Sequence, residues 1–527
     1  MCLFAGATKW YCSPTGSDVT GTGTISAPYF SLSVAWTAAT AGDTIYLRGG
    51  VYSYPIAQEI RGKAHMKVWN YPGETPVFHR GDYVQDPEKY FDWIGIFGDY
   101  CNGLSIKGIE VSYYPQFTHA TWGAPSSFGI WLTDIDTVHM ENMNVHHNGG
   151  GVMFNNCSDV TVINSDFHHN QDSLGDDPYG GADGLVLRNE DDTTSVSTVR
   201  GCRFWWNSDD GLDLWYNDGV VYIDSCWSFY NGYIPGTFST GGDGSGFKNG
   251  ATAFNFSSRV KRYYTRCISA RNRSGGLDNN GALCGTNFYN CLSYLNTRGM
   301  TFNNGYPVIR NVIAYANTAY NTLDDKTNWD HTNNSWNGAV TVDDTDFESL
   351  DTTQLYDSRV NNYLPSITFG TLASISDLID AGIDVGLLYT GIAPDLGFSE
   401  YEEITIPTVT TVATSSITTT TAISGGDVTS EGDTTVTARG VCWGTSANPT
   451  VLNSHTSDGS GTGIFTSNIT GLSSGTTYHV RAYATNNAGT AYGIDRTFTT
   501  LSISSFDNTT IKYRNNIVKH KNKIIIQ

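Results

Sequence analysis

The segments NMNVHHN at 142–148 and NSDFHHN at 164–170 are two copies of a pattern that recurs along this chain. Further copies end at Asn207, Asn231, Asn272, Asn296 and Asn317. The gaps between successive final asparagines are 22, 37, 24, 41, 24 and 21 residues, so four cluster near one value and two contain an insertion. Repetition at this period indicates a solenoid whose coils are made of short strands.

Two columns of the repeat are interpreted as structural. We expect the final asparagines to stack into a ladder of side-chain hydrogen bonds. Five residues before them stand small or apolar residues, among them Cys202, Cys226, Cys267 and Cys291. Stacked coils place like residues over one another, so these cysteines are predicted to form an inward stack rather than disulfides. The ten cysteines include no CxxC pair of the kind that binds zinc.

A second aligned segment, of the form Gly-apolar-x, follows each asparagine. Side chains alternate along a strand, so if the apolar residue points inward, the residue after it points outward. This makes Asp213, Lys248 and Asp278 outward neighbours on successive coils, about 4.8 Å apart. The same alignment places Asp183 and Asp210 one coil apart.

Charged residues gather in three of these segments, which read GADGLVLRN at 181–189, NSDDGLDLW at 207–215 and GDGSGFKNG at 242–250. The alignment brings four carboxylates together, those of Asp183, Asp209, Asp210 and Asp213. So many like charges do not sit side by side without a cation. Carboxylate oxygens are the ligands that Ca²⁺ prefers, so we predict a calcium site here.

Lys248, next to this site, has two interpretations. It could bridge Asp213 and Asp278 on a solvated face, or it could act in a reaction beside the metal. The density of acids and the flanking insertions, which would wall a groove, favour the second. The candidate substrate-binding residues around it are Arg271, Arg273, Arg298 and Asp278. The histidine pairs at 146–147 and 168–169 recur at the repeat period, which favours surface ladder residues over metal ligands.

Composition excludes several classes of function. The 527-residue chain has a net charge of −21, whereas nucleic acid demands a basic surface. An anionic substrate would be repelled unless a bound cation reverses the charge locally. The sequence has no apolar run of about 18 residues, so we predict no membrane span. The opening MCLFAGATKW is too short for a signal-peptide core and is interpreted as the neighbourhood of a removed export signal, which predicts a secreted or cell-surface protein.

The chain is predicted to contain two domains and a tail. Residues 8–405 form the solenoid, with a capping helix in FSLSVAWTAATAGD at 30–43 and another helical piece in TLASISDLIDAGIDVG at 371–386. Residues 406–500 are Thr/Ser-rich with alternating strand patterns, and GLSSGTTYHVRAYATNNAGTAYG resembles a fibronectin type III domain, with Tyr478 at its tyrosine corner. Residues 501–527 form a polar, then basic tail, interpreted either as part of a sorting signal or as an unpacked end. We expect a monomer.

The elements NSDDGLDLW, the upstream GADG and the downstream GFKNG resemble the family 9 polysaccharide lyases. The resemblance spans residues 8–400 and implies an all-β, right-handed parallel β-helix. Position by position, it implies calcium ligands at Asp183, Asp209, Asp210 and Asp213 and a catalytic base at Lys248. The implied substrate is an acidic polysaccharide, either polygalacturonate or, as for some members of the family, rhamnogalacturonan.

The implied reaction is β-elimination at a uronate unit. Calcium would stabilise the charge that develops next to C5, and a neutral lysine would take the C5 proton. Activity is therefore expected to rise into alkaline pH.

Two other classes of function stay open from the residues alone. A β-helical glycoside hydrolase would use two of the aspartates as acid and base, without calcium, and would give saturated products. A non-catalytic carbohydrate-binding surface protein would bind the polymer and release no product.

Overall fold

The computed structural model describes residues 7–54, 56–80, 94–114, 127–173, 178–190, 192–250, 260–302, 306–319, 330–402 and 405–503. Contacts within the chain divide it into two compact units, Met1–Tyr401 and Glu402–Gln527. Among the described residues, no helix combines the length and apolar character that a membrane crossing requires.

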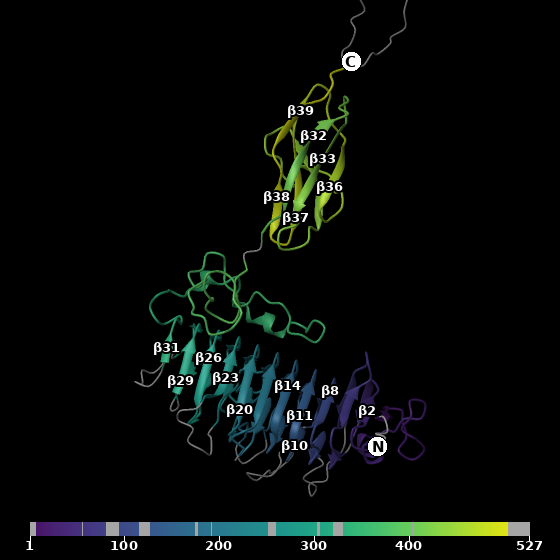
Figure 1. Cartoon of the computed structure of the whole chain (residues 1–527), viewed down its shortest axis with the longest axis vertical. Coiled ribbons are helices and arrows are strands. Elements are labelled where there is room, and N and C mark those ends of the chain that lie inside the picture. The colour runs from purple at the N-terminus through teal and green to yellow at the C-terminus, as the bar shows by residue number, and fades with distance from the viewer. Residues whose placement is uncertain are drawn as a thin grey trace, which may run out of the picture. The chain divides into compact units, whose positions relative to one another are not determined.

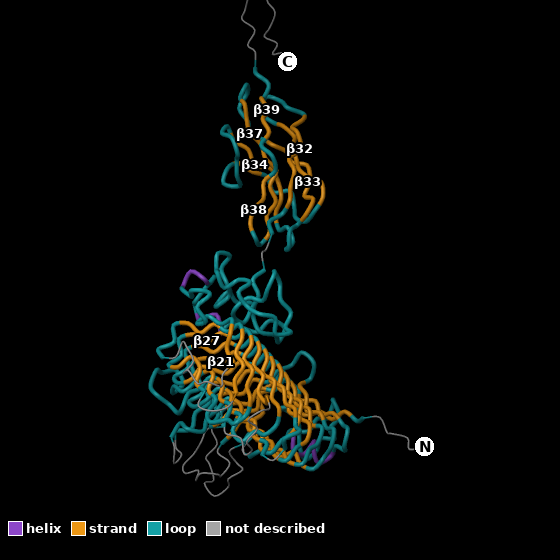
Figure 2. Tube along the Cα trace, turned by 60° about the vertical axis from the view of Figure 1, so that its left-hand side comes forward, coloured by secondary structure: helices purple, strands orange, loops and turns teal. Residues whose placement is uncertain are grey.

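The first unit is a stack of coils in which each complete coil contributes one strand to each of three parallel sheets (Figures 1 and 2). The 12-stranded sheet contains β1 (Lys9–Cys12), β2 (Thr44–Leu47), β5 (Lys67–Asn70), β8 (Leu104–Lys107), β11 (Asp136–Glu141), β14 (Ser158–Ile163), β17 (Val196–Arg200), β20 (Val220–Asp224), β23 (Val260–Thr265), β26 (Gly285–Tyr289), β29 (Tyr306–Arg310) and β31 (Asp330–Thr332). The predicted parallel solenoid is therefore confirmed.

The other two sheets complete the coil. The 10-stranded sheet contains β3 (Gly50–Ser53), β6 (Pro76–His79), β9 (Glu110–Ser112), β12 (Asn144–His146), β15 (Asp166–His168), β18 (Arg203–Trp205), β21 (Trp227–Phe229), β24 (Ile268–Ala270), β27 (Leu292–Tyr294) and β30 (Ile313–Tyr315). The nine-stranded sheet contains β4 (Gln58–Arg61), β7 (Ile96–Asp99), β10 (Phe128–Thr133), β13 (Gly150–Asn155), β16 (Leu185–Arg188), β19 (Leu212–Asp213), β22 (Phe247–Lys248), β25 (Gly275–Asp278) and β28 (Arg298–Thr301). The nine-stranded sheet carries the charged stretches.

The interior of the stack is filled by columns of like residues. The inward column of the nine-stranded sheet is fully buried and includes Val152, Leu185, Leu212, Phe247, Leu277 and Met300. The cysteine column is also buried, and the cysteines among the described residues are all free thiols. Both columns were expected from the alternation of the repeat.

The asparagines form the expected ladder between the 10-stranded and nine-stranded sheets. Asn207 Nδ2 donates to Asn231 Oδ1 at 3.0 Å, and Asn231 Nδ2 donates to Asn272 Oδ1 at 3.0 Å. The same Oδ1 atoms accept the backbone N–H of the preceding asparagine. Each rung therefore ties a side chain and a turn of one coil to the next coil.

One of the two predicted helices is present. Helix α1 (Leu32–Ala38) buries Leu32, Ala35 and Trp36 at the N-terminal end of the stack and so covers coils that would otherwise end open. The helix predicted at 371–386 is wrong, because this segment forms turns. Its Leu372 and Leu378 pack into an apolar cluster on the outside of the stack, so tertiary packing outweighs the local helical pattern.

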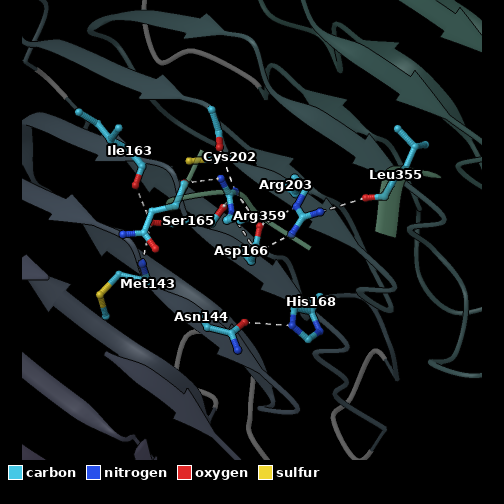
Figure 3. A network of polar contacts seen from close by, with 12 residues as sticks. Met143, Asn144, Ile163, Ser165, Asp166, His168, Cys202, Arg203, Leu355 and Arg359 are labelled. Carbon is cyan, nitrogen blue, oxygen red and sulfur yellow. Dashed lines mark hydrogen bonds and ion pairs between the residues drawn. The ribbon is translucent and has the colours of Figure 1, made fainter. Parts of the chain in front are cut away.

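A polar clamp holds the segment after the last coil against the stack (Figure 3). This segment contains two short 3-10 helices, η2 (Asp344–Asp346) and η3 (Thr352–Tyr356). Asp166 on β15 accepts hydrogen bonds from Arg203 at 2.8 and 2.9 Å and from Arg359 at 2.7 and 3.0 Å. Arg203 also donates to the carbonyl of Leu355 at 3.2 Å. One carboxylate thus joins two coils to the following segment.

The second unit is a small antiparallel sandwich. One sheet contains β32 (Thr408–Ser415), β33 (Ala422–Ser430) and β36 (Gly463–Ile469), and the other contains β34 (Ala438–Gly444), β35 (Ser454–His455), β37 (Thr477–Asn486), β38 (Gly489–Tyr492) and β39 (Arg496–Thr499). Tyr478 Oη accepts the backbone N–H of Ser473 at 3.0 Å, the kind of bond back to the chain that a tyrosine corner makes. The tail from 504 onward lies outside the described residues.

The clamp predicts a cost for removing Asp166. Asp166→Ala should lower the free energy of unfolding by about 3 kcal/mol at neutral pH, because it leaves the buried Arg203 without a counter-charge. Burial alone would raise the pKa of Asp166, but the hydrogen bonds from Arg203 and Arg359 lower it below its ordinary value. Its stabilising effect is therefore present above about pH 4 and declines as the pH falls further, which urea denaturation at several pH values would measure.

Asp224→Ala is the matched control, because Asp224 makes a similar paired contact with the exposed Arg266. An exposed pair of this kind contributes less than about 1 kcal/mol. Equal losses in the two variants would contradict a special role for the buried clamp.

Candidate active site

The charged residues of the repeat lie on adjacent strands of the nine-stranded sheet. Leu212 on β19 pairs with Phe247 on β22, which places Asp213 beside Lys248. The next pairing, between β22 and β25, places Lys248 beside Asp278. The pairing has no register shift at these positions. Lys248 therefore neighbours both Asp213, which is 35 residues earlier in the sequence, and Asp278, which is 30 residues later.

Three buried carboxylates converge just before these strands. Oxygens of Asp183, Asp209 and Asp210 lie within 4.8 Å of one another. Backbone N–H groups orient all three, since Asp210 N donates to Asp183 at 3.1 Å, Asp243 N to Asp209 at 2.6 Å and Ser245 N to Asp210 at 2.5 Å. The fold therefore holds the acids together despite their mutual repulsion.

The electrostatics of this group fit a bound cation. Burial raises the pKa of Asp183 and of Asp209 well above the ordinary value, and neighbouring aspartates raise both further. Burial also raises the pKa of Asp213 to about 6. Ionised carboxylates are thus disfavoured here unless positive charge is added, and an all-oxygen donor set suits a hard divalent cation such as Ca²⁺.

Asp213 stands slightly apart from the other three acids. It is not part of the group whose oxygens lie within 4.8 Å of one another. Its Oδ2 lies 3.4 Å from Lys248 Nζ, whereas its buried Oδ1 makes no hydrogen bond within the described part of the chain. A buried carboxylate oxygen without a partner is costly, and a bound cation could take this oxygen as a ligand.

Lys248 is enclosed by carboxylates. Its Nζ donates to Asp210 Oδ2 at 2.7 Å and lies 3.6 Å from Asp243 Oδ2. Its side chain is only 11% exposed. Burial alone would lower the pKa of Lys248, but the charges of Asp210 and Asp213 raise it above the ordinary value. In the chain without a cation, this amine is therefore held as an ammonium ion.

Asp243 is the residue of the site that the sequence alignment did not single out. It lies in the insertion between Asn231 and Lys248, and its side chain is 78% exposed. Arg273 holds this loop through hydrogen bonds to the carbonyls of Gly242 and Asp243. The available signal was an aspartate between two glycines in GDGSG, but an insertion has no counterpart in the other coils from which its position could be inferred.

The four predicted substrate-binding residues occupy different places. Asp278 is beside Lys248 in register and accepts from Ser245 Oγ at 3.3 Å. Arg298 begins β28 and is exposed. Arg273 supports the loop of Asp243. Arg271 donates to Thr352 at 3.0 Å and lies over the ring of Tyr230, so it packs the segment after the coils.

The arrangement combines a candidate cation site with a candidate proton acceptor. The acid group and the amine share Asp210, so the two functions would act on the same part of a bound substrate. The exposed carboxylate of Asp243 marks the side that reaches solvent. These features suit an acidic substrate whose charge a cation can offset.

Comparison with known proteins identifies the family. A family model described as "Pel9A-like, right handed beta helix region" matches residues 10–334. Pectate lyase L of Dickeya chrysanthemi is 31% identical over 415 residues, which cover 74% of this chain and 90% of the relative. Pectate lyase PEL9 of Emericella nidulans is 28% identical over 375 residues, covering 66% of this chain and 88% of the relative.

Solved structures agree with these matches. The crystal structure of pectate lyase Pel9A superposes with a TM-score of 0.62 at 27% identity and covers 75% of this chain and 97% of that one. A rhamnogalacturonan lyase has the same fold, with a TM-score of 0.56 at 23% identity over 70% of this chain and 97% of that one. Given the family match across the coils and the likeness to named pectate lyases over most of the chain, the protein belongs to the Pel9A-like β-helix family and is a polysaccharide lyase of the pectate lyase type.

Proposed function

We propose that this protein is a calcium-dependent lyase that cleaves pectate-type polygalacturonate by β-elimination, with Lys248 as the base. The observation that carries the proposal is the contact between Lys248 Nζ and Asp210, a member of the buried three-aspartate group. The names of the relatives, pectate lyase L and pectate lyase PEL9, support pectate as the substrate.

Four aspartates would hold the cation, namely Asp183, Asp209, Asp210 and Asp213. The raised pKa values of Asp183, Asp209 and Asp213 support this, because burial and neighbouring aspartates together outweigh the charge of Lys248 at each carboxylate. When bound, calcium would offset the charge of these aspartates and stabilise negative charge on the carboxylate of the substrate. Oxygen donors alone make up the set, which favours calcium over zinc.

Lys248 would take the C5 proton of a uronate unit. Its burial disfavours the ammonium form, and the carboxylates of Asp210 and Asp213 now outweigh that effect. Once their charge is offset, the same burial favours the neutral amine, which can accept a proton. The electron pair of the C5–H bond forms a C4–C5 double bond, the C4–O bond breaks, and the leaving oxygen is released on the departing chain.

The remaining charges of the site would position the substrate. Asp278 is next to Lys248 in the sheet, and Arg298 is exposed one coil further along. We propose that Arg298 pairs with a uronate carboxylate and that Arg273 acts by holding the loop of Asp243. The protein would act as a monomer outside the cell, where its polymeric substrate is found.

The role of Lys248 predicts a large loss of activity on its removal. Lys248→Ala should lower kcat on polygalacturonate by about 100- to 10,000-fold, which is what a positioned base contributes. The rate of the wild type should rise with pH, since only the neutral form of Lys248 accepts a proton. Absorbance of the unsaturated product would measure both effects.

Lys107→Ala is the control, because Lys107 pairs with Glu141 on the 12-stranded sheet and is partly exposed. Its turnover should match that of the wild type. Normal turnover in Lys248→Ala would exclude Lys248 as the base and would leave the family assignment intact.

Calcium should stabilise the fold as well as permit turnover. At a free calcium concentration of about 100 times Kd, the free energy of unfolding should rise by about 2.7 kcal/mol, because the ion binds only the assembled coils. A chelator should remove both this stabilisation and the product. Thermal unfolding with and without calcium measures the first effect independently of catalysis.

Two substitutions test the ligands. Asp209→Asn should reduce the stabilisation by calcium, because it removes one charge from the group, whereas Asp136→Asn on the 12-stranded sheet should not. A calcium-induced rise that is the same in both variants would show that the ion binds elsewhere.

A further inference from the structure

A second polar surface is formed by the side chains that come just before the asparagine ladder, among them those of His147 and His169. His147 and His169, which precede the ladder asparagines Asn148 and Asn170, have a left-handed backbone with φ values of 55° each. Tyr113, which precedes Tyr114 at the same place one coil earlier, has a φ of 61°. Their rings stack along the coils, with centroids 4.9 Å apart between Tyr113 and His147 and 5.0 Å apart between His147 and His169. The stack therefore repeats at the spacing of the coils.

A cavity of about 450 Å³ adjoins this stack. It is lined by Tyr113, His147, Asn148, His169, Gln171, Ser173, Pro235 and Gly236. The wall thus combines aromatic rings, amides and a hydroxyl, and none of these lining residues carries an acidic or strongly basic side chain. Such a mixture suits a small polar ligand without charge.

Hydrogen bonds fix the tautomer of His147. Glu110 Oε1 lies 3.3 Å from His146 Nε2, so a carboxylate that only accepts requires a proton on that nitrogen. In the tautomer that carries this proton alone, His146 accepts at Nδ1, which lies 2.7 Å from Nδ1 of His147. His147 must donate across this contact, which leaves its Nε2 as an acceptor.

The next coil repeats the arrangement. Asn144 Nδ2 donates to Glu110 Oε2 at 3.5 Å, which turns Asn144 Oδ1 toward Nε2 of His168 at 3.1 Å (Figure 3). His168 Nδ1 then accepts from His169 Nδ1 at 2.7 Å. Nε2 of His169 is therefore an acceptor as well, and Glu110 sets the direction of both chains.

The imidazoles of His147, His168 and His169 are neutral at physiological pH. Burial lowers the pKa of His147, lowers that of His168 well below the ordinary value and lowers that of His169 to about 4. Neighbouring imidazoles lower all three further. Neither His147 nor His169 has a hydrogen-bond partner at Nε2 among the described residues.

We propose that this cavity binds an uncharged sugar unit, whose hydroxyl groups donate to Nε2 of His147 and of His169. Two acceptors one coil apart, with the amides of Asn148 and Gln171 nearby, match a ligand that carries several hydroxyl donors. A uronate carboxylate would instead face two lone pairs and no lining cation, so the cavity should discriminate against acidic units.

The cavity is also connected to the acid group. Gln171 precedes Asp172, which accepts a hydrogen bond from Ser208 Oγ at 3.3 Å, and Ser208 directly precedes Asp209. The proposal does not rest on the role of Lys248.

Calorimetric titration of the full chain with methyl α-galactoside and with galacturonate provides the test, because the two sugars differ in charge at C6. The neutral sugar should bind, and galacturonate should bind at least 10-fold more weakly when calcium is absent. Replacing both acceptors, as His147→Phe with His169→Phe, keeps flat rings in the stack and should weaken binding of the neutral sugar at least 10-fold. His139→Phe, on the 12-stranded sheet, is the matched control and should bind normally.

Nitrogen NMR of ¹⁵N-histidine-labelled wild type keeps the proposal testable if the double variant does not fold. It should show His147 and His169 protonated at Nδ1, with Nε2 shifting on addition of the neutral sugar. Protonation at Nε2, unchanged binding by a folded double variant, or equal binding of both sugars would overturn the proposal. Lys248→Ala should bind methyl α-galactoside like the wild type, so failure of the base assignment would be seen separately.

Discussion

The buried asparagine ladder is the interaction on which the geometry of the coils depends. Each side-chain amide accepts the backbone N–H of one coil and donates to the amide of the next, as between Asn207 and Asn231. A slip of one residue would leave these buried groups unpaired, and each unpaired group costs about 1–3 kcal/mol. The ladder therefore fixes the register of the turn that leads into the nine-stranded sheet.

A fixed register allows the loops to vary without moving the site. The chain takes 24 residues from Asn207 to Asn231 and 41 from Asn231 to Asn272, yet Asp213 and Lys248 still meet in adjacent strands. The longer coil contributes Asp243, whose backbone N–H orients Asp209. Insertions can thus add side chains around the acid group, while the strands keep its distances constant.

The contrast between repeated strands and variable loops also decides how much of the site could be predicted from the sequence. The sheet positions of Asp213, Lys248 and Asp278 follow from strand alternation alone, because each coil repeats one pattern. The placement of Asp243 and Arg271 does not follow, because loop contacts and the segment after the coils determine it. The prediction of a helix at 371–386 was wrong for a related reason. Leu372 and Leu378 of this segment pack against the outer surface of the coils, and this packing does not require a helix.

The stacking of equivalent residues on successive coils also produces two surfaces that differ in their electrostatics. Next to the ladder on one side, three carboxylates converge without a counter-ion of their own, apart from the amine of Lys248. On the other side, the carboxylate of Glu110 is matched by hydrogen-bond donors, and the imidazoles of His147 and His169 stay neutral. The acid group opposes folding in the absence of a cation, so its persistence requires the ladder and the Asp166 clamp to exceed that repulsion. A site built this way gains stability when it binds a cation. The hydrogen-bonding groups of the imidazole surface are already paired, except at Nε2 of His147 and of His169, two residues that line the cavity.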